Sequence, residues 1–490
     1  MERVGTGQQA WQESVFLDGT FQRPAQGGTL PVRDKASGEI FGLAGLAGAA
    51  DADVAVAAAL PAQRAWSERT YAERAGLLRA AAAVLADRAK EWRELIMRET
   101  GCIAGKADYE IAAAASELAE AAALASRATG EVLPSGHAGR FSLSERIPLG
   151  LVGVITPWNF PLVLGMRVIA PALALGNAVL VKPSPETPCS GGLAIAELFA
   201  AAGAPAGILQ VLPGDVEAGE RLVSHPDVAM IHFTGSTTVG RRIAQAAAGQ
   251  LKKVSLELGG NNALLVLDDA DIDQATMIGA WSAFHYQGQT CITAGRHIVH
   301  RAVAGAYLSG LAARAEAITV GNTVTEEVGL GPMINARQLE RARQMLDEAV
   351  GAGARVVAGG TVDGPYFRPT VVADVSPSSR LWTEEIFAPI APVLVVDDDD
   401  TAVRIANDTP YGLVDSVLTA DLARGVRVAR RLRAGMVHVN DATPQDEALA
   451  PFGGMGASGL GGRSGGDANL EEFTQRRWLT VAPGPVHYPY

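Results

Sequence analysis

The chain has 490 residues, of which 48% are hydrophobic and 19% charged, so we expect two or three domains with ample buried cores rather than disorder. Lysine and arginine total 41 against 53 acidic residues. The resulting net charge of −12 argues against nucleic acid as a partner, because phosphate binding needs a basic surface. The chain has three cysteines, Cys102, Cys189 and Cys291. Their number is odd, and none of them forms a CxxC motif. We therefore expect no metal, no disulfide framework and a cytoplasmic location.

The N-terminal segment Met1–Thr20 has scattered polar residues and no apolar core, so we expect no secretory signal. The most apolar stretches are rich in alanine, and Ile111–Ser126 is interrupted by Glu117 and Glu120. Such stretches are typical of helices packed in a soluble protein rather than of membrane spans, and no membrane partner is expected.

Two helical segments come first. Apolar residues recur at helical spacing from Thr70 to Thr100, and Gly101 supplies a stop. A second, alanine-rich segment reaches about Ala128. From Gly130 to Pro148 the composition changes to Gly, Ser, Pro and short apolar runs, which predicts a hairpin between domains.

Short apolar runs then alternate with segments of helical character. The runs are Leu151–Ile155, Ala178–Val181, Ile208–Val211, Val228–Phe233 and Val254–Leu256. This interval predicts βαβ units in a parallel, doubly wound α/β sheet, whose ligands bind at the carboxyl ends of the strands. After Gly260 a second alternating region runs to about Asn440. The chain closes with a Gly-rich stretch and a predicted strand at Trp478–Val481.

Cys291 is the candidate nucleophile. A free cysteine is usually a small buried hydrophobe, but Cys291 follows Gly288 and a polar residue, where the backbone turns. Cys102 follows a helix stop and Cys189 opens a helix, so core or surface roles suit them better. A reactive thiolate needs a base or positive potential nearby. His285 is the nearest candidate, and it could equally be a surface histidine.

Polar residues at predicted strand ends offer further chemistry. Glu257 is either a solvated carboxylate at a strand end or a general base. Gly259 and Gly260 follow it, and their lack of side chains would let other groups approach the backbone there. Asn159, between two prolines, either caps the following helix or donates to a developing oxyanion. The strand–glycine turn–helix pattern of Phe233–Gly240 presents a helix N-terminus to a phosphate, although it is not GxGxxG. Lys182 either contacts phosphate or ribose or lies on the surface.

Seven motifs occur in an order and at spacings that resemble the aldehyde dehydrogenase superfamily over nearly the whole chain. They are Pro157–Pro161, Lys182–Ser184, Phe233–Ser236, Glu257–Gly260, Gly288–Cys291, Glu385–Phe387 and Pro451–Gly454. The resemblance implies an α/β fold with a Rossmann-type cofactor domain, an α/β catalytic domain and a small bridging β hairpin with a C-terminal strand.

The same resemblance implies a domain division and an assembly. We expect the dinucleotide-binding domain at residues 1–129 and 149–259 and the catalytic domain at 260–455. Residues 130–148 and 470–490 would be bridging elements that pair subunits in a homodimer or homotetramer.

The family's mechanism places three residues in catalysis. Cys291 would attack the aldehyde, and Asn159 with the Cys291 backbone N–H would form the oxyanion hole. Hydride transfer to a nicotinamide would leave a thioester, because a tetrahedral thiohemiacetal gives up hydride more readily than a planar aldehyde. Glu257 would activate the water that hydrolyses the thioester.

The cofactor residues also follow from the resemblance. Lys182 and Glu385 would hold ribose hydroxyls, Ser236 the pyrophosphate, and Phe387 would pack near the nicotinamide ribose. The other expected cofactor residues are Thr156, Pro157, Trp158, Ser184, Gly235, Leu258 and Gly259. Many members carry Glu three residues after the lysine, where this chain has Pro185, with Glu186 one position later. A carboxylate at that position would repel a 2′-phosphate, so its displacement weakens the case for strict NAD use. We expect NAD as the cofactor, with NADP as an alternative.

Further segments resemble the benzaldehyde dehydrogenase branch. They are Gly454–Arg463, Ala294–His297, Asn469–Thr474 and Arg477–Trp478. Gly456 stands where many members have lysine, and Ala388 replaces a usual glycine, a change we expect to be tolerated. The predicted substrate is an aromatic aldehyde such as benzaldehyde, oxidised to the acid. Phe160 and Leu164 would line an apolar tunnel, although both suit a core equally well.

Three alternatives stay open at this point. The first is oxidation of an aliphatic aldehyde or semialdehyde within the same superfamily. The second is a cysteine hydrolase or acyltransferase without redox chemistry, which needs a His–Cys pair that no motif among the eight histidines provides. The third is a non-catalytic binding protein, which would need none of Cys291, Glu257 and Asn159.

Overall fold

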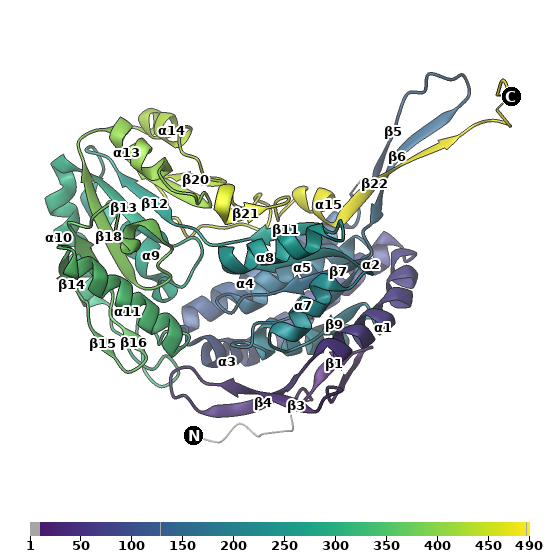
Figure 1. The fold of residues 1–490 in the computed structure, drawn as a ribbon, viewed down its shortest axis with the longest axis horizontal. Coiled ribbons are helices and arrows are strands. Elements are labelled where there is room, and N and C mark those ends of the chain that lie inside the picture. Colours follow the sequence, from purple (N-terminus) through teal and green to yellow (C-terminus); the bar gives the residue numbers. More distant parts are fainter. Residues whose placement is uncertain (1–9, 128, 487) are drawn as a thin grey trace.

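Residues 10–127, 129–486 and 488–490 are described by the computed structural model. Residues 1–9 and 128 of the expected cofactor domain, and residue 487 of the expected bridging element, lie outside that description, as does the start of the segment in which no secretory signal is expected. The described chain forms two α/β bodies and a protruding β arm (Figure 1), which confirms the predicted fold class. None of its described helices combines the length and apolarity that a bilayer span requires.

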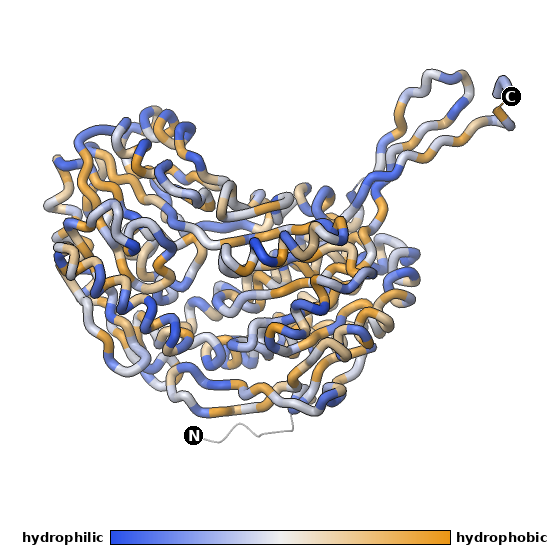
Figure 2. Tube along the Cα trace, in the orientation of Figure 1, coloured by the Kyte–Doolittle hydropathy of each residue, from blue (hydrophilic) through white to orange (hydrophobic). Residues whose placement is uncertain are grey.

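The first body is built on an eight-stranded sheet with the order β2-β1-β9-β8-β7-β10-β11-β21. Its strands are β1 (Val15–Leu17), β2 (Thr20–Gln22), β7 (Leu151–Ile155), β8 (Ala178–Lys182), β9 (Leu209–Val211), β10 (Val228–Thr234), β11 (Lys253–Glu257) and β21 (Gly459–Leu460). The five strands from β7 to β11 are mutually parallel, as predicted. β1 pairs antiparallel with β9 on one side of this set, and β21 pairs antiparallel with β11 on the other. Hydrophobic residues run along the central strands of both bodies (Figure 2).

Helices cover both faces of this sheet. One face carries α1 (Ala49–Ser67), α7 (Val216–Ser224) and α8 (Thr237–Ala248). The other carries α2 (Tyr71–Asp87), α4 (Ala104–Leu124), α5 (Pro161–Ala174) and α6 (Ala194–Ala201), which continues the π-helical turn η1 (Cys189–Leu193). Both faces are apolar because neighbouring residues of one strand point to opposite helix layers. Leu151 belongs to the core under α1, α7 and α8, and Val152 belongs to the core under α2, α4, α5 and α6.

Two helix predictions need correction. The segment from Thr70 to Thr100 is not one helix: it divides at Arg88 into α2 and α3 (Ala89–Thr100), since Arg88 has φ −105° and ψ 17°. Gly101 ends α3 in a left-handed conformation, as predicted. The alanine-rich helix α4 ends at Leu124 rather than near residue 128.

The second body is a seven-stranded sheet with the order β14-β17-β18-β13-β12-β19-β20. Its strands are β12 (Asn262–Val266), β13 (Ala294–His300), β14 (Arg355–Ala358), β17 (Thr370–Ala373), β18 (Ile390–Val396), β19 (Val414–Leu418) and β20 (Met436–Val439). Helices α9 (Ile272–Phe284) and α10 (Arg301–Ala317) pack on one face. Helices α11 (Ala336–Gly351), α13 (Asp399–Asn407) and α14 (Leu422–Ala429) pack on the other.

The arm is a three-stranded antiparallel sheet that projects from the first body (Figure 1). The predicted hairpin is formed by β5 (Gly130–Val132) and β6 (Phe141–Pro148). The predicted terminal strand is β22 (Thr474–Val481), which begins four residues before Trp478 and pairs with β6 along its whole length. The remaining elements are β3 (Gly28–Arg33), β4 (Ile40–Leu46), β15 (Val362–Asp363), β16 (Tyr366–Phe367), α12 (Arg380–Thr383), α15 (Ala468–Phe473), η2 (His285–Gly288) and η3 (Gly456–Ser458).

Candidate active site

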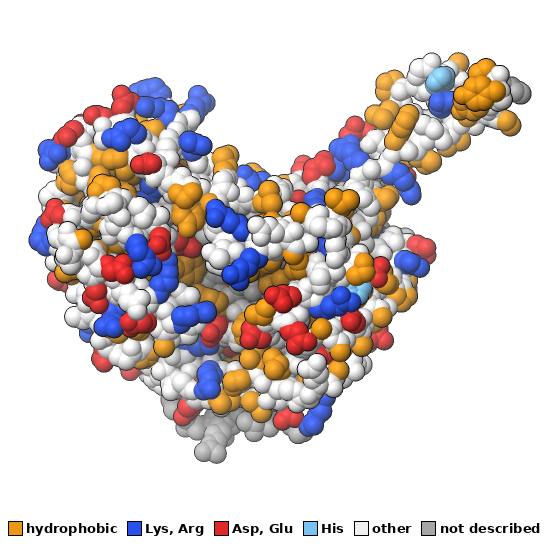
Figure 3. Space-filling view, in the orientation of Figure 1, with side chains coloured by type: hydrophobic (Ala, Val, Ile, Leu, Met, Phe, Trp, Pro, Cys, Tyr) orange, Lys and Arg blue, Asp and Glu red, His pale blue; other side chains and the backbone are white. Residues whose placement is uncertain are grey.

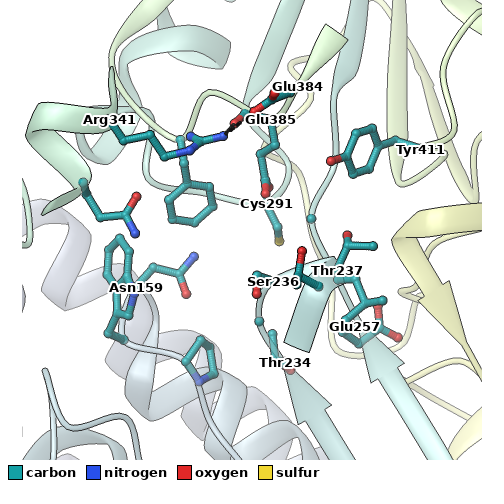
Figure 4. Close-up of a pocket in the computed structure, with 18 residues that line it drawn as sticks. Asn159, Thr234, Ser236, Thr237, Glu257, Cys291, Arg341, Glu384, Glu385 and Tyr411 are labelled. Atoms are coloured by element: carbon teal, nitrogen blue, oxygen red, sulfur yellow. Dashed lines mark hydrogen bonds and ion pairs between the residues drawn. The ribbon is translucent and has the colours of Figure 1, made fainter. Parts of the chain in front are cut away.

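A cavity of about 510 Å³ lies at the carboxyl ends of β10 and β11, and residues from both bodies line it (Figure 4). Most of the predicted site residues are among them: Pro157, Trp158, Asn159, Gly235, Ser236, Glu257, Leu258, Gly259, Cys291, Glu385 and Phe387. Residues that are far apart in the sequence therefore meet where a doubly wound sheet is expected to bind its ligand.

Cys291 follows η2, a turn with an unusual backbone. Tyr286, Gln287 and Gly288 all have positive φ, and a Cβ at Gly288 would lie 2.3 Å from the Ala388 carbonyl oxygen, so only glycine fits there. Among the three cysteines, Cys291 is the one that is partly exposed and lines the cavity. Burial raises the pKa of its thiol, and the Glu385 and Glu257 carboxylates raise it further. A raised pKa favours the protonated thiol, so a nucleophilic role for Cys291 would require a base nearby.

Asn262 holds the backbone of the cysteine loop. Its Nδ2 donates to the carbonyl oxygens of Cys291 at 2.8 Å and Thr293 at 2.7 Å, and its Oδ1 accepts from the Val414 N–H at 3.2 Å. This buried side chain ties the loop to two strands of the second sheet. The orientation of the Cys291 peptide is thus set by a residue that the sequence motifs did not single out.

Asn159 is buried beside the cysteine loop. Its Nδ2 donates to the Gln289 carbonyl oxygen at 3.0 Å. The alternative that Asn159 caps the following helix is wrong, because Phe160 occupies the N-cap of α5. A primary amide carries two N–H donors, so one remains for a ligand after the bond to Gln289.

Glu257 ends β11 and is only 7% exposed. Burial raises the pKa of its carboxyl to about 8, and its Oε2 has no hydrogen-bond partner among the described residues. A carboxyl with a pKa near neutrality and a free oxygen is suited to accept and release a proton during turnover.

Glu385 faces the same cavity from the second body (Figure 4). It accepts a hydrogen bond from the Gly260 N–H at 3.1 Å, and burial raises its pKa to about 7. A Cβ at Gly259 would lie 2.2 Å from Glu385 Oε2, so the glycine is what allows this carboxylate to reach the end of β11.

The opposite part of the cavity suits a dinucleotide phosphate. β10 ends at Thr234, and the 12-residue helix α8 begins after Ser236, whose Oγ accepts from the Val239 N–H at 3.4 Å. The N-terminus of α8 therefore points its backbone N–H groups and its positive dipole end toward the cavity. The Trp158 and Phe387 rings meet edge to face at 5.4 Å on the wall.

The sequence model of the aldehyde dehydrogenase family matches residues 21–479. The chain belongs to the aldehyde dehydrogenase family. It is 46% identical over 483 residues to a benzaldehyde dehydrogenase [NAD(+)] of Pseudomonas putida, with 99% of each chain covered. It is also 46% identical over 481 residues to a vanillin dehydrogenase of an Amycolatopsis species, with 98% of each covered. The crystal structure of Staphylococcus aureus betaine aldehyde dehydrogenase in complex with NAD+ is 28% identical, has a TM-score of 0.95, and covers 98% of this chain and 96% of its own.

Five predicted site residues of this aldehyde dehydrogenase do not line the cavity: Thr156, Lys182, Ser184, Phe160 and Leu164. The first three lie at or just beyond the carboxyl ends of β7 and β8, where Lys182 pairs with Ile155 and burial lowers the pKa of its ammonium to about 8. Phe160 instead packs edge to face on Tyr286 at 5.5 Å, and Leu164 packs against the core of the first body. The cavity therefore does not include the two residues predicted for the substrate tunnel.

Glu186, the displaced acidic residue of the cofactor motif, is engaged elsewhere. Its carboxylate pairs with Lys35 at 2.6 Å and accepts from Asn335 Nδ2 at 2.7 Å. Asn335 is also the N-cap of α11, so Glu186 links the cofactor body to the second body.

Several cavity residues were not named from the sequence. Thr234, Thr237 and Thr238 lie within the Phe233–Gly240 pattern, whereas Gln338, Arg341, Glu384 and Tyr411 lie outside all the motifs. Arg341 donates to the carbonyl oxygens of Glu385 at 2.8 Å and Ile386 at 3.0 Å, and so holds the backbone of that motif. No local pattern distinguishes Gln338, Arg341, Glu384 and Tyr411 from an ordinary polar surface.

Arg167 could have been found from the sequence. It is the single charged residue of α5, a helix of 14 otherwise apolar or small residues. A charge in such a helix must be paired. Arg167 is indeed paired with Glu117 at 2.9 Å and with Asp446, and its charge lowers the pKa of both Glu257 and Cys291.

His285 is not a partner of the cysteine. It stacks on Trp281 at 4.2 Å, and burial lowers the pKa of its ring to about 4. Among the described residues that line the cavity there is no histidine. This disfavours the cysteine hydrolase, because its chemistry needs a His–Cys pair.

Proposed function

We propose that this aldehyde dehydrogenase oxidises aromatic aldehydes of the benzaldehyde type to carboxylic acids, with NAD(P) as the hydride acceptor. The observation that carries the proposal is the meeting of Cys291, the Asn159 amide and the free Glu257 carboxylate at one cavity. The named activities of two relatives, a benzaldehyde and a vanillin dehydrogenase, support the aromatic substrate class.

Cys291 is the proposed nucleophile. Because the pKa of its thiol is raised, it must lose a proton before attack, and Glu257 is the base at the same cavity. The thiolate sulfur then bonds to the aldehyde carbon, and the C=O electron pair moves onto oxygen. The free N–H of the Asn159 amide and the Cys291 backbone N–H stabilise that oxyanion, which is the largest single contribution to many acyl-transfer rates.

Loss of hydride from the former aldehyde carbon converts the thiohemiacetal into a thioester on Cys291. When bound, the nicotinamide supplies the acceptor for this hydride. Glu257, once its first proton has passed to solvent, accepts a proton from the water that attacks the thioester. The C–S bond then breaks, and the carboxylic acid and the free thiol are released.

We propose that the cavity and the neighbouring strand ends hold a nicotinamide dinucleotide. The N-terminus of α8 with Ser236 and Gly235 would hold the pyrophosphate, and Glu385 and Lys182 the ribose hydroxyls. The other proposed contacts are Thr156, Pro157, Trp158, Ser184, Leu258, Gly259 and Phe387. We propose NAD as the preferred cofactor, with NADP accepted as well, because Glu186 is held by Lys35 and Asn335 rather than free to repel a 2′-phosphate.

The substrate wall and the domain division are also proposals. Phe160 and Leu164 remain proposed members of an apolar wall on the side of α5, although neither lines the cavity described above. We assign residues 1–129 and 149–259 to cofactor binding, 260–455 to catalysis, and 130–148 and 470–490 to pairing of subunits in a homodimer or homotetramer. The second sheet, which lies wholly within 260–455, supports the catalytic assignment.

A panel of aromatic aldehydes, aliphatic aldehydes and semialdehydes, assayed spectrophotometrically with both cofactors, tests the proposal. We expect the highest kcat/KM with benzaldehyde-type substrates, and loss of all turnover in Cys291→Ala but not in the matched control Cys102→Ala. A higher kcat/KM for aliphatic aldehydes or semialdehydes would contradict the aromatic assignment. Ester cleavage without NAD(P)H formation would favour a hydrolase, and full activity of Cys291→Ala would favour a non-catalytic protein.

A further inference from the structure

Lys106 is a buried charge next to the proposed oxyanion hole. It lies in the first turn of α4 and is 1% exposed. Its Nζ forms an ion pair with Glu110 Oε2 at 2.5 Å and donates to the main-chain carbonyl oxygen of Asn159 at 2.7 Å. Two of the three N–H donors of its ammonium are thus bound to oxygen.

The remaining side of the ammonium faces aromatic rings. Nζ lies 4.3 Å from the ring centroid of Phe160 and 4.5 Å from that of Tyr286. Both distances are within the range of cation–π attraction. Phe160 follows Asn159 directly, whereas Tyr286 belongs to the positive-φ turn that leads to Cys291. Lys106 is therefore a shared partner of the two chain segments that would form the oxyanion hole.

Glu110 extends this arrangement to the helix that follows Asn159. Its Oε1 accepts from the backbone N–H groups of Leu162 at 2.7 Å and Val163 at 3.3 Å. These N–H groups belong to the first turn of α5 and have no acceptor within the helix. The N-cap residue Phe160 supplies none either, because its side chain makes no cap bond. Glu110 thus caps the N-terminus of α5, while Lys106 binds the carbonyl oxygen of Asn159, two residues before that helix.

We propose that Lys106 is a positioning residue for the oxyanion hole: its ammonium, bound to the Asn159 carbonyl and placed against Phe160 and Tyr286, sets the position of the Asn159 amide relative to Cys291. The inference rests on the proposed role of Asn159. A helix-borne side chain can fix this geometry because its own position is set by burial and by the pairing with Glu110.

The test needs variants that do not leave the buried Glu110 carboxylate without a cation. Removing Lys106 alone would strand the Glu110 carboxylate and could unfold the protein. The reference is therefore Glu110→Gln, in which the amide oxygen still accepts from α5. Lys106 loses its ion-pair partner there but still donates to the Asn159 carbonyl oxygen and contacts the two rings. The reference is accepted when its thermal unfolding midpoint lies above the assay temperature. The test variant is Lys106→Met/Glu110→Gln. If it melts below the assay temperature, Lys106→Gln/Glu110→Gln keeps a neutral polar group and takes its place.

The measurement is the single-turnover rate of NAD(P)H formation from benzaldehyde in the holoenzyme. Against Glu110→Gln, we expect the loss of Lys106 to lower this rate by about 10- to 100-fold, the effect of misplacing a group by a fraction of an ångström to an ångström. In an Asn159→Ala background, the same change should cost less than about 3-fold, because residues that act as a unit are not additive.

Alkylation of Cys291 by iodoacetamide separates positioning from general disruption. This reaction develops no oxyanion, so its rate should stay within about 3-fold of the reference while aldehyde oxidation falls. An unchanged oxidation rate, an equal loss in the Asn159→Ala background, or a parallel loss of alkylation would each overturn the role of Lys106. An Asn159→Ala variant with the wild-type rate would overturn the oxyanion assignment itself, and the inference with it.

Discussion

At the scale of single residues, the site combines one thiol with two carboxyls whose pKa values lie near neutrality. Burial raises the pKa of Glu257 to about 8 and that of Glu385 to about 7. Both carboxylates in turn raise the pKa of Cys291. The charge state of the cavity therefore changes in the pH range where the enzyme would work. The cation Arg167, which is paired with Glu117 and Asp446, limits the rise of the Glu257 pKa.

The first prediction concerns the pH dependence of turnover. Glu257 acts as a base only when deprotonated, so kcat should rise with pH and reach half of its plateau near the pKa of about 8. Glu257→Gln should lower kcat by about 100-fold or more and remove this rise. The measurement is kcat from roughly pH 6 to pH 9 in both proteins.

Asp415 provides a matched control for this prediction. Burial raises its pKa to about 7 as well, but it accepts from the Ala263 N–H at 2.7 Å and does not line the cavity. Asp415→Asn should keep the midpoint of wild type. A wild-type profile that stays flat over the whole range would contradict the role of Glu257.

At the scale of elements, the Gly-rich segment near the C-terminus completes the first sheet. Its short strand β21 pairs antiparallel with the end of β11, with Gly459 opposite Glu257. Ser458, fully buried, donates from Oγ to the Gly259 carbonyl oxygen at 2.6 Å and accepts from the Gly412 N–H at 3.0 Å. The strand end that carries the proposed base is thus held by residues about 200 positions away.

The second prediction tests this support. Ser458→Ala leaves the Gly412 N–H and the Gly259 carbonyl without their partner, which should lower the free energy of unfolding by about 1–3 kcal/mol. Because the end of β11 loses one of its anchors, the side-chain bond to the Gly259 carbonyl, kcat should fall as well. Chemical denaturation and steady-state kinetics measure the two effects. A stability loss with unchanged kcat would show that Ser458 supports the fold without positioning Glu257.

At the scale of the whole molecule, the arm has one apolar face. Opposed residues of an antiparallel sheet share a face, and one face carries Val132, Phe141, Leu143, Leu479 and Val481. Leu143 is half-buried and the other four are exposed, and hydrophobic side chains are conspicuous on the arm in the space-filling view (Figure 3). An apolar face that projects from the body cannot be covered by its own chain, so it supports the proposed pairing of subunits.

The third prediction follows from that face. Leu479→Arg/Val481→Arg should convert the protein from a dimer or tetramer into a smaller species, because charges at a subunit contact are not solvated there. Light scattering after size exclusion measures the mass. Thr480→Arg, on the opposite face of the same strand, is the matched control and should keep the wild-type mass. An unchanged mass in the double variant would place the subunit contact elsewhere.

Local patterns were sufficient for much of the fold. The five strands from β7 to β11 could be predicted because parallel strands buried on both faces read as continuous apolar runs between turns. Gly101 could be predicted as a helix end, since a left-handed residue there favours glycine. The break at Arg88 and the short strand β21 could not, because the first lies within continuous helical periodicity and the second depends on a distant partner strand.

The sequence by itself determined the family and the α/β fold class, and it singled out Cys291, Glu257 and Asn159 as the proposed catalytic residues, because ordered motifs at fixed spacings carry that information over nearly the whole chain. Only the tertiary structure decided which residues meet at the cavity. Arg341 and Tyr411 line the cavity, whereas Phe160 and Leu164 do not. Lys106 is hydrogen-bonded to the carbonyl oxygen of Asn159. The reason is physical: burial, pKa and hydrogen bonding at one point depend on side chains that the fold draws together from distant segments, and no local pattern records those distances.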